Sequence, residues 1–235
     1  MKYILSGKIK EEKIESRAIE KMAPWVICDG SFERILNNYK TKDNQGAILD
    51  IGVGSGVSLE LAEPYFSKLH GVDLFSYLTP EIKPKIVFSA VDLNFEKLPH
   101  NDNSFEFITA FQVIEHLENP FFVMREAARV LKRGGFFVLS VPNPYHLSFK
   151  IKYLFTNNMP PWTRDNNHLL FLTKDVFAKT YLDNFDLLET IYQRGAVPFW
   201  GRLRMIFGKI IKKHAMVLPR WEIFGRRVCY VLRKK

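Results

Sequence analysis

The chain has 235 residues, of which 47% are hydrophobic, so it is long enough for one sizeable α/β core and short for two. Its two cysteines, Cys28 and Cys229, show no metal or redox spacing. The N-terminal apolar run is too short for a signal peptide, and no apolar run is long enough to span a membrane. We therefore expect one cytoplasmic domain over residues 1–235. The net charge of +9 is concentrated in residues 201–235, which hold 11 Lys and Arg against one acid, but no RNA-binding signature accompanies it, which argues against nucleic acid as a partner.

The first part of the chain predicts a helical cap followed by an α/β core. Residues 9–45 are expected to be helical, with Trp25 and Phe32 as apolar anchors. Over residues 46–141 strands and helices alternate, which predicts a parallel sheet wrapped by helices on both faces.

A glycine-rich turn follows the first predicted strand, in residues 47–56. The strand carries an acid, Asp50, and three glycines follow at Gly52, Gly54 and Gly56. Glycine lets the backbone turn tightly into the next helix and lets a ligand approach the bare amides. The third glycine comes one residue early for the dinucleotide fingerprint, and no lysine is present for a P-loop. The turn resembles the D-x-G-x-G-x-G signature of class I S-adenosylmethionine (SAM) methyltransferases; a glycine-rich turn without a ligand is the alternative.

The next two predicted strands also end in acids. Asp73 closes the strand over residues 69–73, where a carboxylate can accept hydrogen bonds from both hydroxyls of a ribose, as it can in dehydrogenases. Asp92 lies near the end of the strand over residues 86–93 and is placed to accept from an adenine amino group. The predicted cofactor site is completed by Leu74, Leu93 and Phe111.

Three further motifs, LPHNDNSFEF, VIEHLENP and EAARVLKRGG, lie in residues 98–135. They are similar to L-P-x-x-D-x-S-F-D, E-H-L and R-V-L-K-P-G-G of the small-molecule methyltransferases that include the ubiquinone-biosynthesis O-methyltransferases. Glu106 replaces an aspartate and Arg133 a proline. The resemblance covers residues 45–143. It implies a Rossmann-like, seven-stranded, mostly parallel sheet with helices on both faces and a final antiparallel strand beside the fifth, and it implies SAM as the cofactor.

His116 is the candidate catalytic residue, because it follows the fourth strand and has a pKa suited to accepting a proton near neutral pH. In the resembled O-methyltransferases the Glu-His pair lies beside the acceptor. Two alternatives are open for His116, a structural helix-cap role and a metal ligand. Related enzymes hold a divalent metal through E-x-x-E-H, but Gln112 replaces the first acid here, so we expect no metal. His168 is a second candidate, although a loop histidine is more often structural.

Two insertions interrupt the alternation after the core. Residues 142–172 are proline-rich and aromatic and too long for an ordinary connection, and residues 195–225 form the second insertion. A helix over 173–184, a strand over 185–193 and a last strand over 227–232 complete the chain. We expect the insertions to build an aromatic acceptor pocket, or else to fold into small satellite cores, because all four tryptophans lie outside the 45–141 core: Trp25, Trp162, Trp200 and Trp221.

Residues 201–213 predict a basic amphipathic helix, because their apolar residues share one stripe and their Lys and Arg lie away from it. Such a helix could rest on an anionic membrane surface, which would make the protein peripheral, or grip a phosphate-bearing acceptor. The alternative is that the stripe packs over the sheet.

Together these features predict a SAM-dependent methyltransferase, most readily one that O-methylates a small, sugar-like or lipid-linked acceptor with His116 as the base. The alternatives are N- or C-methylation, and a non-catalytic SAM-binding or scaffold protein of the same fold. The acceptor itself is not encoded in any of the motifs.

Overall fold

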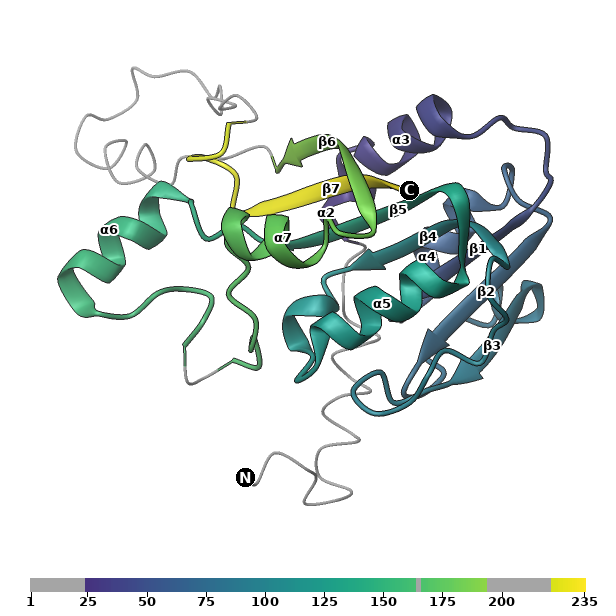
Figure 1. Ribbon diagram of the computed structural model, residues 1–235, viewed down its shortest axis with the longest axis horizontal. Helices are drawn as coiled ribbons and strands as arrows, with labels where there is room; N and C mark the ends of the chain where they lie inside the picture. The colour runs from purple at the N-terminus through teal and green to yellow at the C-terminus, as the bar shows by residue number, and fades with distance from the viewer. Residues whose placement is uncertain (1–23, 164–165, 194–220) are drawn as a thin grey trace, which may run out of the picture.

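The computed structural model describes residues 24–163, 166–193 and 221–235, which contain one seven-stranded sheet (Figure 1). Its strands are β1 (Ala47–Ile51), β2 (Lys68–Asp73), β3 (Ile86–Ala90), β4 (Phe105–Phe111), β5 (Leu131–Pro142), β6 (Phe185–Tyr192) and β7 (Arg227–Lys234). The order is β3-β2-β1-β4-β5-β7-β6, in which β1 to β5 are parallel, β7 is antiparallel to β5, and β6 is antiparallel to β7. The Rossmann-like α/β fold expected from the sequence is confirmed, including the antiparallel strand beside the fifth.

The described helices are α2 (Trp25–Cys28), α3 (Ser31–Tyr39), α4 (Val57–Ala62), α5 (Pro120–Val130), α6 (Leu147–Thr156) and α7 (Lys174–Thr180), with 3₁₀ turns η1 (Lys83–Lys85) and η2 (Ile114–His116). The strict alternation of strand and helix expected over the core is wrong in its middle. Only η1 joins β2 to β3, and no helix is assigned between β3 and β4. Among the described helices, none has the length and apolarity that crossing a bilayer requires.

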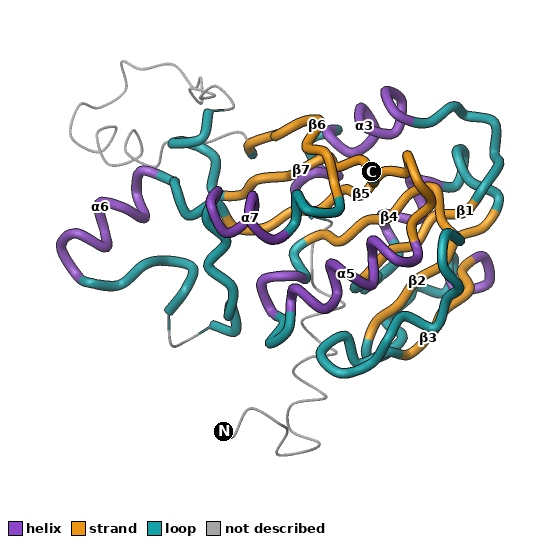
Figure 2. Tube along the Cα trace, in the orientation of Figure 1, coloured by secondary structure: helices purple, strands orange, loops and turns teal. Residues whose placement is uncertain are grey.

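Alternate residues of each central strand pack into two separate hydrophobic cores, because successive side chains of a strand point to opposite faces. In β5, Phe137 and Leu139 join the core that also contains Val123 of α5 and Phe177 of α7. Val138 between them joins the other core. Figure 2 shows α5 and α7 lying over the sheet on the near side, and the second core holds the buried residues of α2, α3 and α4. Helices therefore cover both faces, as expected.

The helical cap and the helix after the first insertion agree only in part with the boundaries predicted from the sequence. In the helical cap predicted over residues 9–45, residues 9–23 lie outside the described part of the chain, but Trp25 and Phe32 are buried in the second core as anchors. The predicted helix over 173–184 is shorter than expected: Thr173 is its N-cap, accepting a hydrogen bond from the Val176 amide, and the helix ends at Thr180.

Candidate active site

The carboxyl ends of β1, β2, β3 and β4 meet at one edge of the sheet, and the predicted cofactor residues lie there. This edge is where open parallel α/β sheets bind ligands. The glycine turn connects β1 to α4, and its amides are held by β2, since Gly52 donates a hydrogen bond to the Val72 carbonyl at 2.8 Å.

The three glycines of the turn have different steric surroundings. A Cβ placed on Gly56 would lie 2.7 Å from Ile82, and one on Gly52 would overlap the side chain of Val113. At Gly54, whose φ is +50°, a Cβ would meet no protein atom within 4 Å. Packing therefore requires the outer two glycines, whereas Gly54 faces the open space that a ligand would use. This cradle fits a cofactor that approaches the backbone closely.

Asp50 lies beneath the turn rather than in it. Its side chain is buried and accepts hydrogen bonds from the hydroxyls of Ser58, on α4, and Thr109, on β4, the latter at 2.6 Å. Burial raises the pKa of Asp50 to about 7, against the opposing effect of the two hydroxyl donors. The carboxyl group ties together β1, α4 and β4, so we assign it the role of shaping the turn. Ser58 and Thr109 are site residues that the sequence reading missed; a hydroxyl in the first turn of the helix after an acid-glycine motif was the available signal.

Asp73 is placed directly opposite Gly54. One carboxylate oxygen accepts from the Gly54 amide at 3.1 Å and the other accepts from the Leu74 amide at 2.8 Å. Each carboxylate oxygen has more than one lone pair, so these bonds orient the group and leave it able to accept from ribose hydroxyls. The Leu74 side chain is exposed.

Asp92 and Leu93 follow β3 and are tied to the end of β2, because Val91 donates to the Asp73 carbonyl at 2.9 Å. The Asp92 side chain accepts from the Asn94 amide at 3.0 Å, and Leu93 is buried. The structure therefore brings both acids to the same edge of the sheet, as predicted.

Phe111 and Gln112 close this edge at the end of β4. Phe111 is buried and packs edge-to-face against Phe32, with ring centroids 5.1 Å apart, so it lies between the cofactor edge and the helical cap. Gln112 has φ 59°, a left-handed conformation that is rare for a residue with a side chain. Its side-chain Nε2 is buried and meets no hydrogen-bond partner among the described residues. A buried donor of this kind fits a polar ligand group. From the sequence, Gln112 is expected only to be a poor metal ligand.

Glu115 and His116 of η2 form one cluster with His168, which lies near the end of the first insertion. Each offers one potential ligand atom, and these atoms lie within 4.8 Å of one another. The insertion is docked by its backbone, because the Leu169 and Leu170 amides donate to the Glu115 carbonyl at 2.7 and 3.2 Å. Glu115 itself is buried. The cluster combines a carboxylate and two imidazoles, which is a donor set that a divalent transition metal accepts.

The His116 ring is oriented by the insertion. Its Nδ1 lies 3.2 Å from the Asn167 carbonyl, and since a carbonyl only accepts, Nδ1 carries the hydrogen in the neutral ring. Nε2 is then the nitrogen with a lone pair, as a proton acceptor requires. His116 is also connected to the glycine turn through Val113. The His116 amide donates to the Val113 carbonyl, and the Val113 side chain packs over Gly52.

The remaining motif residues build a structural clamp. Arg129 donates to the Leu98 and His100 carbonyls at 2.9 and 2.8 Å and pairs with Asp102 and Glu126. Glu126 in turn accepts from the Leu98 amide at 3.0 Å. The similarity of these motifs to those of methyltransferases thus reflects how the loop before β4 is fastened to α5.

Of the aromatic residues expected at an acceptor pocket, Trp162 lies beside His168 of the histidine cluster. Its ring nitrogen donates to the Leu170 carbonyl at 2.6 Å, and its ring lies 4.7 Å from that of Phe171 and 6.5 Å from that of His168. Trp25 packs in the second core instead, and Trp221 is exposed. Trp200, most of the second insertion and the basic helix predicted over 201–213 lie outside the described residues.

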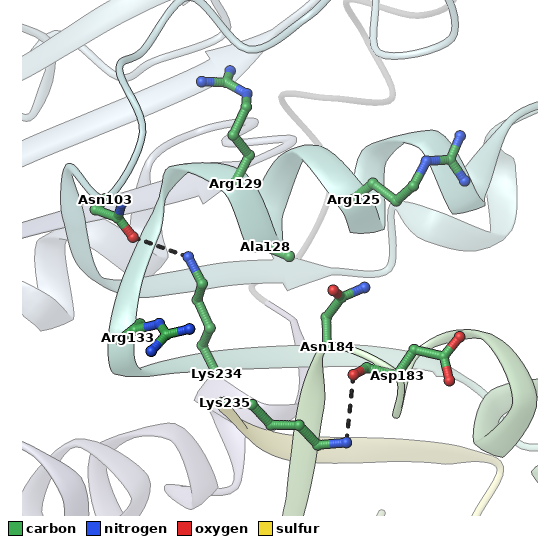
Figure 3. Close-up of a pocket in the computed structure, with 9 residues that line it drawn as sticks. All are labelled: Asn103, Arg125, Ala128, Arg129, Arg133, Asp183, Asn184, Lys234 and Lys235. Atoms are coloured by element: carbon green, nitrogen blue, oxygen red, sulfur yellow. Dashed lines mark hydrogen bonds between the residues drawn. The ribbon is translucent and has the colours of Figure 1, made fainter.

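A cavity of about 810 Å³ lies at the opposite end of the strands from the candidate active site, and basic residues make up much of its lining. Figure 3 shows Lys234 directed at Asn103 and Lys235 at Asp183, and both contacts are hydrogen bonds. The cavity lies where β5 begins and β7 ends, so it is separate from the candidate active site.

Comparisons with known proteins agree with the fold of the core. A family model described as a methyltransferase domain matches residues 49–139. Residues 49–139 form a class I SAM-dependent methyltransferase domain. The matched range contains the glycine turn, both strand-end acids and the Glu-His pair. SAM is therefore the cofactor that this domain implies.

Curated relatives match different shares of this chain. A probable SAM-dependent methyltransferase of Mycolicibacterium smegmatis is 31% identical over 99 residues, which cover 41% of this chain and 38% of the relative. A ubiquinone biosynthesis O-methyltransferase of a Shewanella species is 26% identical over 199 residues, covering 75% of this chain and 83% of the relative. The chain spans about half the length, or less, of the first curated relatives that it matches.

The solved structure of a SAM-dependent methyltransferase from Archaeoglobus fulgidus has the same fold, with a TM-score of 0.60 and 18% identity, over 96% of this chain and 99% of the other. At this identity the similarity extends to the fold alone. The acceptor must be inferred from the residues of the chain itself.

Proposed function

We propose that the chain transfers a methyl group from SAM to a hydroxyl of a small acceptor, which is held between the glycine turn and the first insertion. The observation that carries this proposal is the position of His116, which is joined through Val113 to the glycine turn and through Asn167 to the insertion. A proton acceptor between a cofactor loop and an acceptor-side insertion suits O-methylation.

Bound SAM supplies an electrophilic methyl group on a positively charged sulfur. In that reaction Nε2 of His116 would accept the proton that the acceptor hydroxyl loses as its oxygen is methylated. The Asn167 carbonyl, as the acceptor for Nδ1–H, holds the ring in the required tautomer and stabilises the imidazolium that results. Asp73 orients the cofactor, and Asp50 keeps the turn in shape.

The chemistry of the first insertion favours an acceptor with an apolar part. Trp162 and Phe171 pack together beside His168, and further apolar side chains of the insertion, among them Leu169, are exposed. A sugar-like or lipid-linked acceptor with a hydroxyl would satisfy this environment, and a lipid-linked one would place the protein at a membrane surface.

Two measurements test the proposal in sequence. Calorimetry with S-adenosylhomocysteine should show binding by the wild-type protein, and a screen with radiolabelled SAM against extracted metabolites should yield a labelled product. Binding without any labelled product would favour a non-catalytic scaffold. A labelled amine or carbon skeleton, identified by mass spectrometry, would replace O-methylation by N- or C-methylation.

A further inference from the structure

Helix α6 presents its apolar stripe to the outside of the molecule. Leu147, Ile151, Leu154 and Phe155 follow the i, i+4, i+7, i+8 spacing that places side chains on one face of a helix. All four are exposed, and Leu154 and Phe155 retain 76% and 80% of their accessible surface. An amphipathic helix normally buries such a stripe against the core, so its orientation here requires an explanation.

The opposite face of α6 is the one that holds it in place. Phe149 is buried, and its ring lies 4.8 Å from that of His146, which caps the helix by accepting from the Ser148 amide. The Leu147 amide donates to the Ile223 carbonyl at 2.8 Å. The helix is therefore anchored through its N-terminal turn and Phe149, with its apolar stripe facing away.

Positive charge borders the stripe on both sides. At 100° per residue, Lys150 and Lys152 fall on either side of the stripe, and no acid occurs in α6. Lysines that flank an exposed apolar stripe match the phosphate groups that surround the acyl chains at a lipid surface. A groove on a protein partner would match the apolar stripe, but it would also have to offer acids along both of its walls.

The position of α6 suits a flat surface. Figure 1 shows it at one extremity of the molecule, beyond the end of the sheet, and Figure 2 shows loops alone joining it to the elements that cover the sheet. Within the described part of the chain, a helix at an extremity can approach a flat surface. The insertion that contains α6 also contains His168 and Trp162.

We propose that α6 is a membrane-contacting helix, which inserts Leu154 and Phe155 between the headgroups of an anionic lipid surface while Lys150 and Lys152 contact the phosphates. This inference goes beyond the proposed methyl transfer, and vesicle binding requires no turnover, so failure of one is distinguishable from failure of the other. It also identifies a described surface for peripheral membrane contact.

The test is cosedimentation of the full chain with vesicles of phosphatidylcholine, with and without phosphatidylglycerol. Wild type should bind the anionic vesicles, and Leu154→Glu/Phe155→Glu should lower its partition coefficient at least about tenfold, because charges replace the inserted side chains. Lys150→Glu/Lys152→Glu should lower the preference for anionic lipid, although the Lys and Arg of residues 201–235 are unchanged in this variant. Val87→Glu, which adds charge at an exposed apolar residue of β3, is the matched control and should bind like wild type.

A second measurement reports insertion directly. In a Cys28→Ser background, Phe155→Cys carrying an environment-sensitive fluorophore should shift its emission to the blue on adding anionic vesicles, whereas Val87→Cys should not. The proposal is overturned if wild type does not bind, if the glutamate pair binds as well as wild type, or if the label stays in water. A concentration-dependent dimer that Leu154→Glu/Phe155→Glu abolishes would assign the stripe to a second copy instead.

Discussion

The rings of His116 and His168 lie edge-to-face with their centroids 4.6 Å apart, although one follows β4 and the other belongs to the insertion after β5. The contact is made possible by the hydrogen bonds from Leu169 and Leu170 to the Glu115 carbonyl. It places a second imidazole beside the proposed base, so the two histidines must be tested together.

His116→Ala should lower the turnover number by about 10² to 10⁴ while leaving the dissociation constant of S-adenosylhomocysteine within about threefold. The reason is that the variant removes the proton acceptor but none of the groups around Gly54 and Asp73. Single-turnover kinetics and calorimetry on the same preparation measure the two quantities. Equal loss of turnover and of cofactor affinity would assign His116 a structural role.

Turnover should be insensitive to a chelator, because the neutral Gln112 stands where an acid would complete the E-x-x-E-H set. The cluster with His168 defines the competing outcome. If EDTA abolishes turnover and Zn²⁺ or Mn²⁺ restores it in wild type but not in His168→Ala, then Glu115, His116 and His168 hold a metal that polarises the acceptor oxygen. Metal analysis of the purified protein provides a readout that does not depend on activity.

Gly54→Ala should weaken S-adenosylhomocysteine binding at least tenfold, because a methyl group would occupy the space in which the cofactor approaches the backbone. The matched control is Gly134→Ala, since Gly134 also has a positive φ and an open Cβ position but lies at the start of β5. Each substitution should lower the free energy of unfolding by about 1 kcal/mol through backbone strain. Equal effects of the two variants on binding would mean that the turn does not hold the cofactor.

Asp50→Asn should change how stability depends on pH. The pKa of Asp50 rises from 3.8 to about 7 on folding, so the folded state binds the proton more tightly, and the associated stability is present below pH 4 and lost as the pH rises through 7. As the pH rises from 4 to 8, the free energy of unfolding of the variant should therefore increase by up to roughly 4 kcal/mol relative to that of wild type. Denaturant unfolding across this range measures the effect, with the exposed Glu60→Gln as the control. If the difference in unfolding free energy between wild type and Asp50→Asn does not change with pH, the argument that burial raises the pKa of Asp50 is contradicted.

The sequence alone was sufficient for the features that depend on neighbouring residues. The glycine spacing after β1 and the acids at Asp73 and Asp92 are local patterns, and the register of a parallel sheet necessarily brings strand ends to one edge. The antiparallel last strand beside the fifth followed from the resemblance, and the pairing of β7 with β5 confirms it.

Only the tertiary structure decided what depends on the path of the chain between elements. Asp50 is buried beneath the Thr109 hydroxyl, and His116 meets His168, although the partners in each pair are far apart in sequence. The exposure of one face of α6 likewise depends on how the chain packs. The apolar stripe of α6 is the plainest case, because periodicity shows that a helix has two faces and only packing shows which of them is turned to solvent.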